Sequence, residues 1–232
     1  MRLDGRIAVR FVLLLAWASF LAWLWFSGEM VRYLGPRTYW VIPFGALTLG
    51  GAALAHLPWL RGGPSEPVRR SDLVSGLIVV APLLLVLAVP QPDLGSLAAS
   101  RKASFGGGGG PALIVPGAGH DGEVAFIDLS YANESEEYAL KAGVVEDEIV
   151  HLTGFVSEVS PDRVRLTRFY VSCCAADAVP YSADILLSPR MGGYSQDQWL
   201  RVRGRIAKDD DGRYVVEPTM IEPVAGPRDP YL

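Results

Sequence analysis

The chain has only two cysteines in 232 residues, and they are neighbours in the sequence, Cys173 and Cys174. A disulfide between distant parts of the chain is therefore excluded, because no further cysteine exists. Charged residues are also scarce, at 20%, whereas half of the residues are hydrophobic. Disordered chains combine low hydrophobicity with high net charge, so this composition excludes a disordered protein.

Sequence signatures of catalysis are absent as well. The chain has no His-x-Glu pair, no Gly-x-Ser-x-Gly and no Walker loop. Its glycine run, residues 106–110, is followed by Pro111 and not by the Lys-Ser/Thr of a phosphate-binding loop, which is typical of a flexible linker. We therefore expect a protein that is not an enzyme, and the sequence identifies no small-molecule substrate.

Charge is divided unevenly between the two halves of the chain. Residues 1–104 carry ten Lys/Arg and five Asp/Glu, a net of +5, and residues 105–232 carry eleven and twenty, a net of −9. A basic, apolar half joined to an acidic half of ordinary composition indicates a membrane anchor followed by a water-soluble domain. The acidic balance of that domain disfavours phosphate backbones, so we do not expect a nucleic-acid partner.

Three apolar runs predict transmembrane helices over about residues 9–27, 38–60 and 72–90. About 20 apolar residues in a helix span the hydrocarbon core of a bilayer, which makes the lipid bilayer an expected partner. The first run exceeds the apolar core of a usual signal peptide and no small-x-small cleavage site follows it, so it is predicted to remain as an anchor. Aromatic residues gather at the run ends, as expected of the headgroup zone: Trp23, Trp25, Tyr33, Tyr39, Trp40 and Trp59.

Basic residues in the short connecting segments predict the orientation of these spans. With the N-terminus in the cytoplasm, the short segments on that side carry six arginines, against four basic residues on the far side. This bias places the C-terminal domain outside the cytoplasm. His56 is an ionisable residue inside a span, but it lies near the end, where such a side chain reaches water.

After a Gly/Pro-rich linker over residues 91–111, residues 112–232 have a period-two apolar pattern that predicts a small β domain. The expected strands are Ile149–Glu158, Arg163–Ser172, Ala183–Leu187, Trp199–Ala207 and Arg213–Ile221, with a further alternating stretch at Glu123–Leu129. A short helix is expected between an N-cap in residues 133–136 and Lys141, and Asp209–Gly212 supplies a hairpin turn. Glycines inside strands, Gly154 and Gly204, are typical of bulges or barrel bends. Five or six short, curved strands predict a small closed barrel of the OB-like kind.

The segment from Arg168 to Ala178 contains both cysteines and is the densest chemical signal. On a regular strand their side chains would point to opposite faces, whereas at a strand end or turn they can converge. Converging thiolates could hold zinc or copper(I), with Asp177 or His151 completing the shell. They could also form a redox-sensitive vicinal disulfide or, more remotely, act as a nucleophile. The remaining alternative is two small buried residues that close the barrel.

The blocks at residues 33–37, 168–178 and 199–204 resemble those of the YcgQ-like permease subunits, bacterial membrane proteins that end in a domain of unknown function. This resemblance implies an accessory, non-enzymatic subunit with a multi-span permease partner in the cell membrane. It also implies a link to divalent metals, zinc foremost, through Cys173, Cys174 and Asp177. One departure is that relatives often have a His-rich loop between the second and third spans, where this chain has residues 61–67 instead.

Three hypotheses follow from these patterns. The first is an accessory permease subunit that handles a divalent metal, zinc foremost, through the vicinal cysteines. The second is a thiol redox protein or sensor that uses the same Cys173–Cys174 pair. The third is a structural, membrane-anchored interaction module in which both thiols are buried. The accessibility of the two sulfur atoms in the folded domain separates the third hypothesis from the others.

Overall fold

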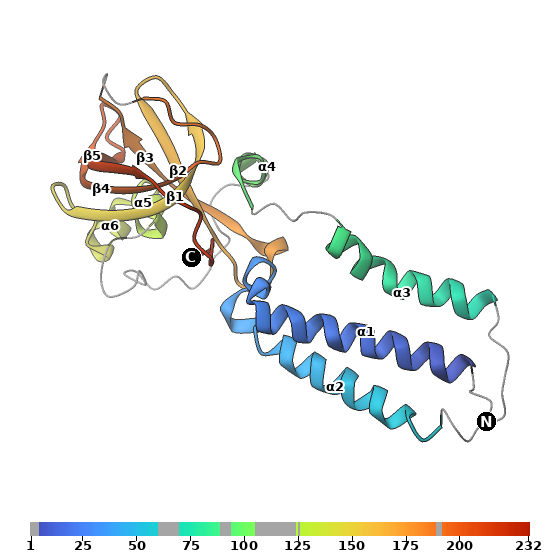
Figure 1. The fold of residues 1–232 in the computed structure, drawn as a ribbon. Helices are drawn as coiled ribbons and strands as arrows, with labels where there is room; N and C mark the ends of the chain where they lie inside the picture. Colours follow the sequence, from blue (N-terminus) through green and yellow to red (C-terminus); the bar gives the residue numbers. More distant parts are fainter. Residues whose placement is uncertain (1–4, 60–69, 89–93, 105–123, 125, 189–191) are drawn as a thin grey trace. The chain divides into compact units, whose positions relative to one another are not determined.

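The computed structural model describes residues 5–59, 70–88, 94–104, 124, 126–188 and 192–232, and the chain divides into two compact units at residues 92 and 93. The first unit contains α1 (Gly5–Ser27), α2 (Val41–His56) and α3 (Arg70–Ala88), with short 3-10 turns at Glu29–Arg32 and Pro36–Thr38 (Figure 1). Among the described residues, three helices are long and apolar enough to cross a membrane: Gly5–Ser27, Pro36–His56 and Arg70–Ala88. A long apolar helix is therefore found in each predicted run, and residues 60, 89 and 90 of the predicted spans lie outside the described residues.

Helix α1 packs against both α2 and α3. Small residues allow the close approach: a Cβ at Gly45 would lie 2.9 Å from the Leu21 side chain. The indole Nε1 of Trp17 donates to the carbonyl of Val79 at 3.1 Å, one turn before Pro82, the proline inside α3. Because proline removes a helical N–H and displaces the carbonyls before it, a side-chain donor is suited to this position.

The second unit is a closed five-stranded barrel with the strand order β1-β2-β3-β5-β4. The strands are β1 (Ile149–Val159), β2 (Arg163–Tyr170), β3 (Val179–Leu186), β4 (Trp199–Lys208) and β5 (Tyr214–Pro223). Neighbouring strands are antiparallel except for β3 and β5, which pair in parallel where Ile185 faces Val216. Closure leaves no long unpaired strand edge, as the sequence prediction of a small barrel required.

Three helices accompany the barrel. They are α4 (Ser96–Ser104), α5 (Phe126–Ala132) and α6 (Glu136–Ala142). Helix α5 was not expected: the alternation over residues 123–129 predicted a sixth strand, which is wrong, because Phe126 and Leu129 lie one helical turn apart and both enter the barrel core. Helix α6 begins within the predicted stretch, where the Ser135 hydroxyl accepts a hydrogen bond from the Tyr138 N–H.

Part of the predicted linker, residues 91–111, is a helix: α4 occupies residues 96–104 and belongs to the second unit. Residues 91–93 and 105–111 lie outside the described residues. The hairpin turn is found as predicted, since the Asp209 N–H donates to the Arg213 carbonyl and Gly212 has a φ of +74°. Gly204 lies at a register shift between β4 and β5, and a Cβ there would lie 2.5 Å from the Glu217 carbonyl oxygen. Only glycine fits this approach without displacing backbone.

Two groups of buried side chains hold the barrel together. The main core fills the barrel and includes Val164, Leu166, Ile185, Leu200 and Val202. A second, smaller cluster packs outside it, beneath α4 and the chain's C-terminal residues: Ala99, Phe155, Phe169, Val171, Ala178 and Tyr231. We refer to these six residues as the outer cluster, and the loop between β2 and β3 is mounted on it.

Candidate metal centre

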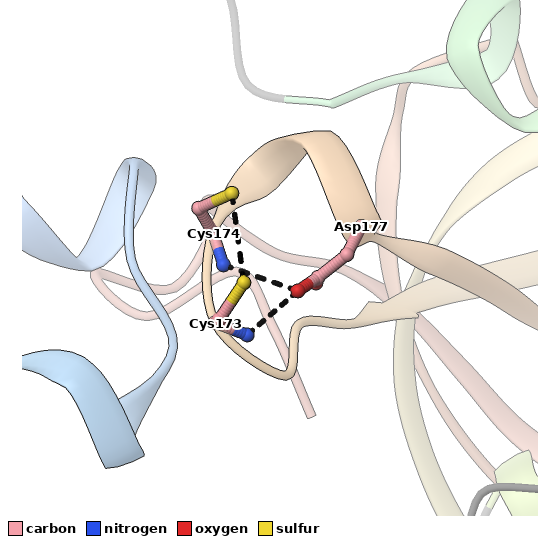
Figure 2. Close-up of side chains that lie close together, drawn as sticks. All are labelled: Cys173, Cys174 and Asp177. Atoms are coloured by element: carbon pink, nitrogen blue, oxygen red, sulfur yellow. Dashed lines mark hydrogen bonds between the residues drawn. The ribbon is translucent and has the colours of Figure 1, made fainter.

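Cys173 and Cys174 lie in the loop between β2 and β3, which we call the thiol loop (residues 171–178). Strand β2 ends at Tyr170, two residues earlier than the sequence pattern predicts, so the cysteines are free of the strand alternation that would separate them. Their Sγ atoms lie 3.8 Å apart (Figure 2). Cys173 is exposed and Cys174 is partly exposed, and neither forms a disulfide. The pair therefore converges, and it is not buried in the way that a purely structural role requires.

Both ends of the thiol loop are anchored in the outer cluster. Val171, at its start, is 2% exposed and Ala178, at its end, is 3% exposed. The C-terminus of the chain closes over the same cluster, because the Leu232 N–H donates to the Phe169 carbonyl at 2.8 Å. Burial of both flanking residues fixes where the loop leaves and re-enters the barrel, so the loop presents its cysteines from a rigid support.

Asp177 organises the interior of the loop. Its carboxylate accepts three backbone N–H groups, from Ser172 at 2.9 Å, from Cys173 at 2.8 Å and from Cys174 at 3.3 Å. The turn Ala175–Asp177 is closed by a hydrogen bond from the Asp177 N–H to the Cys174 carbonyl, and the Cys174 sulfur also accepts from that N–H. The Cys-Ala-Ala-Asp sequence is therefore a capping box with sulfur in place of the usual hydroxyl, and it turns both thiols to the same side.

The same contacts set the protonation of the loop. Burial pushes the pKa of Asp177 upward, but hydrogen bonds from the Cys173 thiol and from three backbone N–H groups outweigh it and hold the pKa below its ordinary value. The hydrogen bonds of Cys173 to Asp177 and to the Cys174 sulfur raise the pKa of the Cys173 thiol to about 11. In the absence of a metal the loop therefore keeps a proton on Cys173, shared with an ionised carboxylate.

Cys173, Cys174 and Asp177 form a group suited to a metal ion. Their ligand atoms all lie within 4.8 Å of one another. In a tetrahedral site with Zn–S bonds of about 2.3 Å, two thiolates lie about 3.8 Å apart, which is the separation found here. A carboxylate has about four acceptor positions, and three are used by backbone N–H groups, so a metal could take the position that the thiol proton now occupies.

His151, the other predicted ligand, does not join this group, and the two remaining histidines were not predicted as ligands. His151 lies in β1 opposite Arg203 of β4 and is exposed, outside the cluster formed by the described residues. His120 lies outside the described residues. His56 is the last residue of α2, and its Nδ1 lies 2.8 Å from the Ala52 carbonyl, so this histidine is at a helix end as expected.

Sequence reasoning missed one residue that contacts the thiol loop. The Lys102 ammonium of α4 donates to the Ala176 carbonyl at 3.0 Å, across 74 residues of sequence. No local pattern reveals such a contact, because Lys102 belongs to a short polar helix inside the stretch that composition marks as a linker. Ala176 and Asp177 also line a cavity of about 790 Å³ together with residues of α4, α5 and the strands β1, β2 and β3.

The architecture thus defines a class of protein with an N-terminal set of apolar helices and a closed barrel that carries a thiol–carboxylate loop. Within that class, residues 118–232 match the family model of the DUF1980 C-terminal domain, which is consistent with the YcgQ-like family that the sequence motifs resemble. The cysteine loop lies inside this domain. No curated protein matches the chain.

Proposed function

We propose that this protein is a non-enzymatic, membrane-anchored accessory subunit of a permease, and that its thiol loop binds a divalent metal ion, with zinc as the first candidate. The observation that carries the metal proposal is the 3.8 Å separation of the two Sγ atoms beside the Asp177 carboxylate. This separation suits two thiolates on one tetrahedral ion. It rests on a loop that is already closed by Asp177, so little ordering is required when the metal binds.

The ligand count supports exchange of the metal. The described residues offer three ligands at this site, and structural zinc sites usually have four protein ligands. A three-ligand site leaves a position for water or for a donor from another molecule. Because Cys173 is exposed, an incoming donor can reach the ion, which suits a subunit that passes metal to or from a partner.

The redox alternative has less support from the same geometry. Reactive thiols generally have a lowered pKa, because the thiolate is the nucleophile. The pKa of Cys173 is raised to about 11, so only a very small fraction is thiolate at neutral pH without a metal. A bound cation reverses this balance, since it displaces the thiol proton directly.

The remaining parts of the proposal concern fold and location. We infer that the barrel is OB-like, supported by its strand order and by the parallel contact between β3 and β5. We place the protein in the bacterial cell membrane with its N-terminus in the cytoplasm and the barrel outside, supported by the three apolar helices and by the distribution of arginines. The permease partner rests on the resemblance of the sequence motifs to YcgQ-like subunits.

Zinc binding to the full chain in detergent micelles tests the metal role. We expect about one zinc per chain by elemental analysis, and loss of this zinc in the double variant Cys173→Ser, Cys174→Ser, because a hydroxyl is a poor ligand for zinc at neutral pH. Zinc affinity should increase as the pH rises toward 11, because the Cys173 thiol must lose its proton to bind the ion. Calorimetric titration in buffers of different ionisation enthalpy measures the number of protons released.

Ser172→Ala is the matched control, because it alters an exposed neighbour in the same loop and leaves its backbone N–H to Asp177 in place. Zinc binding that survives in the double cysteine variant would contradict the metal role. A reversible Cys173–Cys174 disulfide in air, with no zinc bound by the reduced protein, would favour the redox alternative. For the transport role, cells that lack the protein should accumulate less zinc, and the wild-type chain should restore uptake where the double variant does not.

A further inference from the structure

Helix α4 is fixed to the barrel at its N-terminal end. The Asp197 carboxylate accepts hydrogen bonds from the Ser96 N–H at 2.6 Å and from the Ser96 hydroxyl at 3.0 Å. Asp197 has a φ of +64° and its own N–H donates to the Val156 carbonyl of β1. A Cβ at Gly95 would lie 2.5 Å from this carboxylate, so a larger residue there would displace the Asp197 side chain. An acidic group at a helix N-terminus satisfies its free N–H groups and opposes its dipole.

The other end of α4 contacts the thiol loop. Lys102 donates to the Ala176 carbonyl at 3.0 Å, next to the ligand Asp177. Between the two ends, Ala99 is 6% exposed and packs in the outer cluster with Val171 and Ala178, the residues that flank the loop. Helix α4 therefore supports the thiol loop in two ways. Lys102 donates a hydrogen bond to a carbonyl inside the loop, and Ala99 belongs to the same buried cluster as the two residues that flank the loop.

We propose that α4 is part of the metal site's support, that Lys102 is its positioning residue, and that metal binding and the docking of α4 stabilise each other. This inference rests on the proposed metal role. By donating to the Ala176 carbonyl, Lys102 holds the loop in the conformation in which the two sulfurs and the Asp177 carboxylate converge, and this is the conformation that suits the ion. The two equilibria are thermodynamically linked. If docking of α4 raises the affinity of the loop for the metal by some factor, metal binding raises the docking equilibrium constant of α4 by the same factor.

The position of α4 in the chain gives this coupling a consequence. Helix α3 ends at Ala88 and α4 begins at Ser96, so seven residues connect the last apolar helix to the helix that contacts the thiol loop. Occupancy of the loop thereby biases the docking of the segment that leads to the membrane helices.

The first experiment measures zinc affinity of the full chain in detergent micelles, by competition with a chromophoric chelator. We expect Lys102→Met to weaken zinc binding about fivefold, because it removes the hydrogen bond that holds the Ala176 carbonyl of the thiol loop. Lys102→Arg should restore most of the affinity, and Arg101→Met is the matched control, since Arg101 is an exposed basic neighbour on the same helix. Recovery in Lys102→Arg, which keeps a donor for the Ala176 carbonyl, separates loss of this hydrogen bond from a general loss of packing.

The second experiment acts on the far end of α4, away from the loop. Asp197→Asn weakens the anchor of Ser96 but keeps a residue that tolerates positive φ, and Asp211→Asn is the control for loss of one exposed carboxylate. We expect Asp197→Asn to weaken zinc binding two- to threefold, about half a decade at most. We also expect zinc to slow hydrogen exchange in residues 96–104 of the wild type at least threefold.

The outcomes separate this inference from the proposed function. A wild type that binds zinc, with unchanged affinity in Lys102→Met and Asp197→Asn and unchanged exchange in α4, would overturn the coupling and leave the metal role intact. A wild type that binds no zinc would overturn both. Loss of affinity in Lys102→Met and Asp197→Asn, with both control variants unaffected, supports the coupling.

Discussion

The same types of apolar side chain are exposed on the helices of the first unit and buried in the barrel of the second. In the first unit, Leu77 and Ile78 of α3 are 65% and 67% exposed, and only 6% of the apolar window of that helix is buried. In the barrel, Leu166 and Ile185 are fully buried. A soluble protein rarely leaves such a continuous apolar surface open, so the exposed side chains of the helices suit a membrane, whereas the barrel buries its apolar side chains in its own core.

The largest expected effect compares a buried with an exposed leucine. Leu166→Ala should lower the free energy of unfolding of the barrel by about 2–5 kcal/mol, because it removes buried methyl groups and leaves a cavity. Leu77→Ala should leave the barrel's unfolding unchanged. Chemical denaturation of the full chain in micelles, followed by near-UV circular dichroism, measures both. Equal losses from the two variants would contradict the division into an apolar helical unit and a water-exposed barrel.

A charge on the outward face of α3 tests the surroundings of the helices directly. Ile78→Arg should disfavour membrane insertion by about 2.5–3.5 kcal/mol, because a guanidinium near the centre of a span loses its hydration. Resistance of the protein to alkaline extraction from membranes measures insertion. Leu140→Arg, at an exposed leucine of α6 outside the three apolar helices, is the comparison, and insertion of Ile78→Arg equal to the wild type would show that α3 does not face lipid.

The smallest effect concerns acid and the thiol loop. Because the pKa of Asp177 is lowered in the folded state, its contribution to stability is complete above the carboxyl's ordinary value of 3.8 and is lost as pH falls through the lowered value. Thermal unfolding of zinc-free protein from neutral pH to about pH 2 measures this loss. Asp177→Asn should remove that part of the pH dependence and Asp211→Asn should not. Identical pH profiles for the wild type and Asp177→Asn would contradict the loop's reliance on the carboxylate.

Much of the fold could be predicted because local patterns and tertiary structure agree. The apolar runs predicted the three long helices, and alternation predicted the barrel strands to within a few residues at most ends. Strand β3 is the exception, since it begins at Val179, four residues before the predicted Ala183. Its first residues pair with the end of β2, where Phe169 faces Pro180, and a proline in a strand gives no signal for that pairing.

The candidate site was predictable in its members but not in its geometry. The proximity of Cys173, Cys174 and Asp177 in sequence suggested a shared ligand, but the convergence of the two sulfurs depends on β2 ending before them and on Asp177 accepting three N–H groups. His151 was an equal candidate for the ligand set on residue type alone. Its position on the outer face of β1 separates it from the cluster of described residues.

The sequence by itself determined the division into membrane-suited helices and an acidic barrel, because hydrophobic length and period two are properties of consecutive residues. It also determined which side chains are available to hold a metal. Only the tertiary structure decided that α5 is a helix, that α4 docks on the barrel and that Lys102 contacts the thiol loop. These outcomes depend on burial and hydrogen bonds between residues far apart in the chain, which no local pattern encodes.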